Sequence, residues 1–192
     1  MKKIGLLGGT FDPPHFGHLI IAEQAREACC LDEVWFLPTR IPPHKVGSNL
    51  CSDDNRIEMV KRAINSNPFF KLSLIEFERN GPSYTIETVK LLLEKHSDDH
   101  FYFIIGGDMV NFLPKWKKID ELLNLITFIG MQRPGHRFEQ LISEKIVMVA
   151  TPQLEISSSE IRERLRNNKS VRYLLPEAVI DYIEEEGIYG KG

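Results

Sequence analysis

The residues with the clearest chemistry lie in segment 8–18, which reads GGTFDPPHFGH. Its paired glycines allow the backbone to approach a ligand closely. His15 and His18 are three residues apart, so both imidazoles can face one anion from the same side of a turn. These residue types at this spacing predict a site that binds phosphate.

The flanking segments explain how segment 8–18 is positioned. Residues 4–7 form an apolar run typical of a short buried strand, and apolar residues recur with helical periodicity over 19–28. A helix N-terminus offers free N–H groups and partial positive charge, so a turn from strand to helix suits an anion. Two other interpretations stay open: a zinc site, although no further Cys or His cluster completes four ligands, and a pair of structural surface histidines.

Strand-like and helix-like segments alternate along the rest of the chain. We expect strands at 33–38, 69–77, 101–105, 126–131 and 146–149, and helices at 54–65, after 82–85, at 158–167 and at 176–186. This order predicts an α/β fold, a Rossmann-like doubly wound parallel sheet with a small helical C-terminal subdomain. We expect one domain over 1–192, its helical C-terminal part covering about 156–192.

Composition limits the function further. The 192 residues are 42% hydrophobic and 27% charged, as in ordinary globular proteins, and the net charge is −3. That charge argues against coating nucleic acid or an anionic membrane, so we expect neither as a partner. Three cysteines without a CxxC pair indicate reduced structural thiols. With no cleavage site after Lys2-Lys3 and no apolar run long enough to span a bilayer, we expect a cytoplasmic protein.

A second phosphate-binding pattern occurs at 156–162, which reads ISSSEIR. Ser157 with Glu160 three residues later forms a capping box, so a helix begins here. Ser158 and Arg162 are four residues apart and emerge on one side of that helix. Their hydroxyl and guanidinium, with the free N–H groups, can grip a polyphosphate, although a plain capped helix remains the alternative.

Together these segments resemble the (H/T)xGH nucleotidylyltransferase superfamily, and the GGTFDPxHxGH form resembles its bacterial nicotinate-nucleotide adenylyltransferases. Segment 156–162 resembles the ISSTxxR motif of that family, with Ser159 in place of Thr. The dinucleotide fingerprint GxGxxG and the P-loop are absent from the sequence. The resemblance implies transfer of AMP from ATP to nicotinate mononucleotide, giving nicotinate adenine dinucleotide and pyrophosphate. A homodimer is compatible with it.

The resemblance also implies roles for individual residues. Catalysis, by neutralising charge, is implied for His15, His18, Lys45 and Arg162. ATP binding is implied for Gly8, Gly9, Thr10, Phe11, His15, His18, Gly106, Asp108, Arg133, Ser157, Ser158 and Arg162. Mononucleotide binding is implied for Thr10, Lys45, Ser83, Tyr84, Thr85, Phe112 and Trp116. We expect no metal ligand in the protein; Mg²⁺ would arrive on the ATP phosphates and water.

Physical reasons support part of this assignment. The face of Trp116 suits a flat cationic ring such as a pyridinium, and a carboxylate at the end of a strand, as at Asp108, accepts hydrogen bonds from ribose hydroxyls. A helix start at Ser83–Thr85 suits the nicotinate carboxylate. Phe112 stands where some relatives have Tyr. As alternatives, Trp116 is a plain core or surface aromatic, and Ser83 or Thr85 only caps the helix.

Rival functions share parts of the pattern. The acceptor could be phosphopantetheine or nicotinamide mononucleotide, although phosphopantetheine enzymes tend to have Thr at the position of His15. A cytidylyltransferase fits the motifs less well. A non-catalytic nucleotide sensor would not need the cations Lys45 and Arg162 together with both histidines.

Overall fold

The computed structural model describes residues 1–41, 50–79, 81–132, 144–152 and 154–190, except for the side chain of Asp108. Its framework is a sheet of parallel strands in the order β3-β2-β1-β4-β5-β6. They are β1 (Lys3–Gly9), β2 (Glu33–Pro38), β3 (Phe70–Leu72), β4 (His100–Gly106), β5 (Thr127–Gln132) and β6 (Ile146–Ala150). The chain winds outward in both directions from β1 and β4, so the predicted doubly wound sheet is confirmed.

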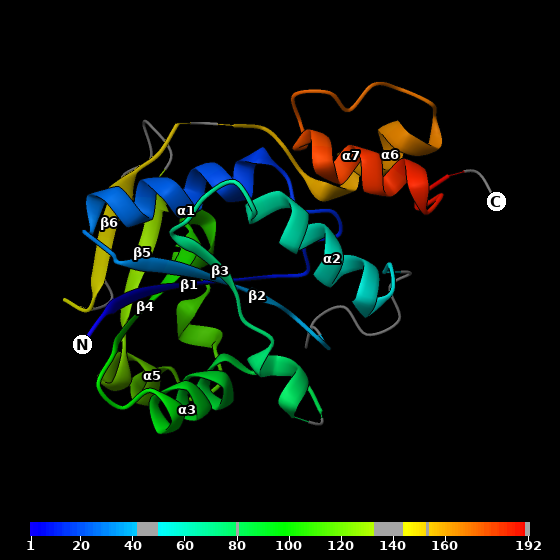
Figure 1. The fold of residues 1–192 in the computed structure, drawn as a ribbon. Helices are drawn as coiled ribbons and strands as arrows, with labels where there is room; N and C mark the ends of the chain where they lie inside the picture. Colours follow the sequence, from blue (N-terminus) through cyan, green and yellow to red (C-terminus); the bar gives the residue numbers. More distant parts are fainter. Residues whose placement is uncertain (42–49, 80, 133–143, 153, 191–192) are drawn as a thin grey trace.

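Helices cover both faces of this sheet (Figure 1). They are α1 (Phe16–Ala28), α2 (Asp53–Ile64), α3 (Thr85–Lys95), α4 (Gly107–Val110), α5 (Ile119–Leu125), α6 (Ser158–Arg166) and α7 (Glu177–Glu185), with short 3-10 turns η1 (Ile75–Glu78) and η2 (Leu113–Lys115). In Figure 1, α1 lies on one face, α3 and α5 lie on the other, and α6 and α7 sit beyond α2. Within the described ranges, no helix has the length and apolar character needed to cross a membrane.

The core consists of two apolar layers, one on each face of the sheet. In β4, Phe101, Phe103 and Ile105 join the layer of α3 and α5, whereas Tyr102 and Ile104 join that of α1 and α2. This division follows from the alternation of side chains along a strand. Because both faces are covered, strands such as β4 are apolar throughout rather than at every second residue.

The predicted strand at 69–77 is wrong over most of its length. β3 pairs with β2 only over Phe70–Leu72, and the chain then turns into η1. Since β3 is the edge strand, it has a partner on one side only, and Ile75 is buried instead in the layer of α3. The other predicted elements are present, with ends that differ by a few residues.

The imidazole of His15 is buried at the start of α1. His15 is the N-cap of α1 and is only 7% exposed. Its Nδ1 has no hydrogen-bond partner among the described residues, and burial lowers the pKa of His15 to about 4. The folded protein therefore keeps His15 neutral over a pH range in which an unfolded chain would protonate it.

We predict that this burial makes the protein less stable in mild acid. Between pH 6.5 and about 4 the unfolded chain binds a proton at His15 that the folded chain excludes, so the free energy of unfolding falls as the pH falls. His15→Asn keeps a favourable N-cap residue and removes this titration. Urea unfolding at several pH values between 6.5 and about 4 should show a smaller fall in the free energy of unfolding for His15→Asn than for the unmodified protein. An equal fall in both proteins would contradict the prediction.

Candidate active site

A cavity of about 950 Å³ opens at the carboxyl ends of β1 and β4. These are the strands between which the winding direction reverses, the place where open α/β sheets bind ligands. Residues 7–9 of β1 and 103–106 of β4 line its floor, and the first turns of α1 and α6 open into it. Two helix N-termini, each with free N–H groups, thus face one cavity.

Most of the predicted binding residues line this cavity. They are Gly8, Gly9, Thr10, His15, His18, Ser83, Tyr84, Thr85, Gly106, Trp116, Ser157, Ser158 and Arg162. They come from segments that are far apart in the sequence, and the parallel sheet brings them together because its strand ends share one edge.

The remaining predicted residues are placed differently. Phe11 is 1% exposed and packs edge-on against His18, with ring centroids 5.0 Å apart. It therefore supports the ring of His18, which lines the cavity. Phe112 lies on the surface, outside the cavity lining, with Nζ of Lys115 5.3 Å from its ring centre. Lys45, Arg133 and the side chain of Asp108 lie outside the described structure.

The backbone of α1 fixes the tautomer of His18. Its Nδ1 accepts a hydrogen bond from the backbone N–H of His15 at 3.1 Å, so in the neutral ring the proton resides on Nε2. Burial, with the neighbouring His15 ring, holds the pKa of His18 well below its usual value. The two rings are therefore neutral imidazoles, which differs from the expectation that both histidines bring positive charge.

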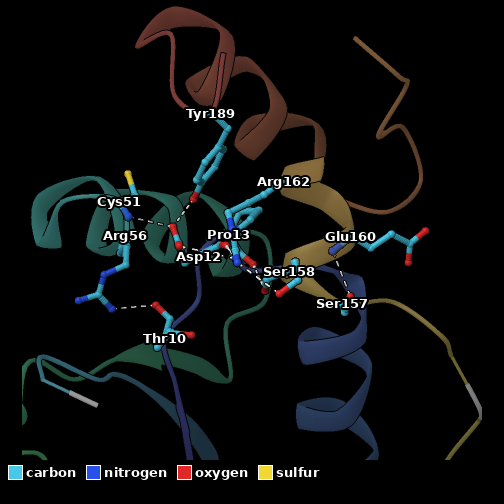
Figure 2. A network of polar contacts seen from close by, with 11 residues as sticks. Thr10, Asp12, Pro13, Cys51, Arg56, Ser157, Ser158, Glu160, Arg162 and Tyr189 are labelled. Atoms are coloured by element: carbon cyan, nitrogen blue, oxygen red, sulfur yellow. Dashed lines mark hydrogen bonds and ion pairs between the residues drawn. The ribbon is translucent and has the colours of Figure 1, made fainter. Parts of the chain in front are cut away.

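The start of α6 carries out two tasks. Ser157 caps it as predicted, its Oγ accepting from the N–H of Glu160 at 3.2 Å. The Ser158 hydroxyl donates to the carbonyl of Pro13 at 2.9 Å, and Nη1 of Arg162 donates to the carbonyl of Asp12 at 2.6 Å. As Figure 2 shows, residues expected to grip a polyphosphate also fasten segment 8–18.

The start of α3 faces the cavity without a side-chain cap. Tyr84 is its N-cap, and in the described structure it makes no capping hydrogen bond. Ser83 is buried; its Oγ accepts from the N–H of Ile41 at 3.4 Å, and its hydroxyl bonds to Glu76. The capping alternative for Ser83 and Thr85 is therefore not realised.

Trp116 forms part of the cavity wall, held by other aromatic rings. Its ring meets Phe103 and Phe128 edge-on, with centroid distances of 5.8 Å and 6.0 Å. Such contacts fix the plane of an indole while it stays partly exposed.

Sequence reasoning missed several lining residues, among them Glu76, Lys117 and Thr151. Glu76 is the most unusual, because its carboxyl group is buried and burial raises its pKa. The hydroxyl of Thr88 donates to Oε1 of Glu76 at 3.1 Å. The sequence did offer a signal, because Glu76 is a charged residue inside an apolar segment. That signal was missed, since segment 69–77 was predicted to be a strand.

Known proteins are similar to this chain in sequence and in structure. Residues 6–164 match the family described as cytidylyltransferase-like. The nicotinate-nucleotide adenylyltransferase of Bacillus subtilis (strain 168) is 51% identical over 189 residues, which cover 98% of this chain and 99% of that protein. The Plasmodium falciparum nicotinic acid mononucleotide adenylyltransferase, solved in complex with NaAD, superposes with a TM-score of 0.82 over 98% of each chain at 24% identity. The chain belongs to the nicotinate-nucleotide adenylyltransferase family of cytidylyltransferase-like proteins.

Proposed function

We propose that this chain transfers AMP from ATP to nicotinate mononucleotide, forming nicotinate adenine dinucleotide and releasing pyrophosphate. The observation that carries the proposal is the composition of this cavity. Phosphate-binding groups at the starts of α1 and α6 share it with Trp116 and the uncapped start of α3. That combination fits a triphosphate next to a ring that bears a carboxylate.

The reaction requires little covalent chemistry from the protein. A phosphate oxygen of the mononucleotide attacks the α-phosphorus of ATP in line, the bond to the bridging oxygen breaks, and pyrophosphate leaves with its electrons. The attacking phosphate is largely ionised at neutral pH, because its second pKa is about 6. The protein therefore has to position two anions and stabilise the charge that develops between them.

His18 is the group that we assign to the α-phosphate. Its Nε2–H can donate to a non-bridging oxygen, and the fixed Nδ1 contact prevents the ring from losing that donor. His15 packs against it, with ring centroids 3.7 Å apart, and assists. The neutral ring of His18 therefore donates without first taking up a proton, and the hydrogen bond strengthens as negative charge collects on the acceptor oxygen. Lys45 is proposed to neutralise substrate phosphate.

The ATP tail is assigned to the start of α6. Ser157, Ser158 and Arg162 supply hydroxyls and a guanidinium beside free N–H groups. Gly8, Gly9 and Gly106 allow close approach of the nucleoside, with Asp108 proposed for the ribose and Arg133 for the adenine.

Mg²⁺ is proposed to enter as part of the substrate, Mg-ATP. Among the described residues, no group of three or more His, Cys, Asp or Glu side chains could hold a metal ion. The cavity lining offers mainly hydroxyls, imidazoles and cations beside the buried carboxyl of Glu76, a mixture that suits phosphate better than a divalent cation. The protein's part is therefore to bind phosphates that already carry the ion.

The mononucleotide is assigned to the other end of the cavity. Trp116 offers a ring face to the pyridinium, and backbone N–H groups near Thr85 can bind the nicotinate carboxylate. Phe112 lies outside the cavity lining, so reading of the carboxylate by main-chain groups is the arrangement that this structure supports.

The wider setting is also a proposal. We propose one domain over 1–192, because Val179 and Ile183 of α7 belong to the same apolar cluster as Ile104 of the sheet. A cytoplasmic location and a homodimer remain predictions from the sequence and the family.

The first test is pyrophosphate release by the purified protein with Mg-ATP and one of three acceptors: nicotinate mononucleotide, nicotinamide mononucleotide or phosphopantetheine. We expect strong preference for the nicotinate compound. His18→Ala, purified in the same way, controls for contaminating activity and should lose roughly 10²- to 10³-fold in turnover, as removal of one transition-state donor typically does. Preference for another acceptor would overturn the substrate assignment, and no release with any acceptor would overturn the reaction.

Trp116→Ala should weaken the mononucleotide selectively. Loss of a cation–π contact worth about 1 kcal/mol should raise KM for nicotinate mononucleotide about fivefold, with KM for ATP nearly unchanged. Trp116→Phe keeps an aromatic face and should recover most of the affinity. Equal increases of both KM values in Trp116→Ala would count against ring stacking and for a general loss of packing on Phe103.

Gly17 leaves the space that the His15 ring occupies. A Cβ built on Gly17 would lie 2.9 Å from Nδ1 and 3.0 Å from Cε1 of His15, closer than real Cβ contacts. Gly17 sits inside α1, where alanine is otherwise the better helix former by about 1 kcal/mol. Space, rather than backbone freedom, is therefore the reason for glycine here.

We predict that Gly17→Ala separates activity from stability. The added methyl group displaces the His15 ring, and a misplacement of about 1 Å can cost roughly 10²-fold in turnover. The gain in helix propensity should keep the free energy of unfolding near that of the unmodified protein. Steady-state kcat and urea unfolding measure the two effects, and an unchanged kcat would show that the His15 position is not needed.

A further inference from the structure

A buried carboxylate sits in the middle of segment 8–18. Asp12 is 0% exposed, and the groups around it come from distant parts of the chain (Figure 2). Its Oδ1 accepts from the hydroxyl of Tyr189 at 2.5 Å and, more weakly, from the N–H of Cys51 at 3.4 Å. A buried carboxylate needs such partners, because desolvation otherwise costs several kcal/mol.

Tyr189 is held in an unusual conformation to make this contact. Its φ is +64°, in the left-handed region that residues other than glycine rarely adopt. Burial, followed by the bond to Asp12, raises the pKa of its hydroxyl, so the group remains a donor. The backbone at Tyr189 is therefore strained, and its side chain contacts Asp12, which lies 177 positions earlier in the sequence.

The other oxygen of Asp12 faces Arg162. Nη1 of Arg162 lies 3.7 Å from Oδ2, an ion pair without a hydrogen bond, and donates instead to the backbone carbonyl of Asp12 at 2.6 Å. In the described structure Oδ2 has no hydrogen-bond partner. Arg162 also lines the cavity, so Asp12 and an incoming phosphate compete for the same guanidinium.

We propose that Tyr189 is a positioning residue for ATP: by holding Oδ1 of Asp12, it keeps the carboxylate from closing onto Arg162 and leaves the guanidinium available to the triphosphate. The inference rests on the proposed function and assigns to it a residue outside every motif discussed above. Without the hydroxyl, Oδ1 would keep only the 3.4 Å contact to Cys51. The buried charge would then be compensated by a tighter Asp12–Arg162 pair.

The end of the chain has other attachments, which provide a matched control. The hydroxyl of Tyr182, on α7, donates to Oδ1 of Asn55 on α2 at 3.0 Å, and Arg62 pairs with Glu185 at 3.2 Å. Neither contact touches segment 8–18. Tyr182→Phe therefore removes one hydroxyl that fastens the C-terminal helix without disturbing Asp12.

The experiment measures kcat and KM for Mg-ATP in Tyr189→Phe and Tyr182→Phe. We expect Tyr189→Phe to raise KM for ATP about tenfold, equivalent to about 1.4 kcal/mol, with kcat and KM for the mononucleotide nearly unchanged. Tyr182→Phe should leave all three constants near those of the unmodified protein. An unchanged KM for ATP in Tyr189→Phe, or the same rise in both variants, would overturn the inference.

A second measurement tests whether Tyr189 acts through Arg162. If it does, Tyr189→Phe should add little to KM for ATP in an Arg162→Ala background, because the affected guanidinium is already gone. A merely structural role would add its full effect in both backgrounds. Additive effects would therefore reject the positioning role.

Calorimetric titration with Mg-ATP alone separates this inference from the proposed reaction. If the unmodified protein binds ATP but uses no acceptor, the reaction is wrong, and the ratio of ATP affinities between the unmodified protein and Tyr189→Phe still decides the role of Tyr189. If the reaction proceeds and the two affinities are equal, the reaction stands and the inference fails. If the unmodified protein binds no ATP, both fail.

Discussion

The backbone of segment 8–18 is held in place mainly by side chains from elsewhere in the chain, and the cavity depends on this restraint. Arg56, 1% exposed on α2, donates to the carbonyl of Thr10 at 2.8 Å and pairs with Asp53 at 2.5 Å. Ser158 and Arg162 hold the next carbonyls, and Tyr189 holds Asp12. A loop without these donors would bury unsatisfied carbonyls and a charge. His15 and His18, at the end of this segment, are therefore positioned by contacts from α2, from α6 and from the chain after α7.

This arrangement explains why α6 and α7 belong to the site although they lie outside the sheet. Their apolar residues Ile161 and Val179 join the core on the α1 and α2 side, which fixes where their polar ends point. Buried polar networks of this kind specify one geometry, because any alternative leaves a member unpaired. Packing of the C-terminal part therefore contributes to the geometry of the phosphate site through the contacts that Arg162 and Tyr189 make with Asp12.

Much of the fold was predictable because it rests on local patterns. Burial on both faces of a sheet explains the apolar runs of β1, β4 and β5 and the helical periodicity of α1 and α2. The capping box at Ser157 indicated where α6 begins. The features that the sequence did not reveal depend on contacts between residues that are separated in the sequence. Nothing near Arg56 or Tyr189 in the sequence indicates that Arg56 bonds to Thr10, 46 positions away, or that Tyr189 bonds to Asp12, 177 positions away. The neutrality of His15 is likewise a consequence of burial, which cannot be inferred from the spacing of His15 and His18 in the sequence.

Neutral histidines have an advantage for a reaction that ends in the release of pyrophosphate. A site that carried fixed positive charge around the triphosphate would bind substrate, transition state and product alike, and uniform binding does not raise kcat. An Nε2–H donor on a neutral His18 ring, the group proposed to contact the α-phosphate, adds a hydrogen bond without fixed charge, so its interaction grows with the negative charge on that phosphate. Likewise, the guanidinium of Arg162 lies 3.7 Å from Oδ2 of Asp12, so part of its positive charge is compensated within the protein. The buried carboxylate and the buried imidazoles thereby favour turnover over retention.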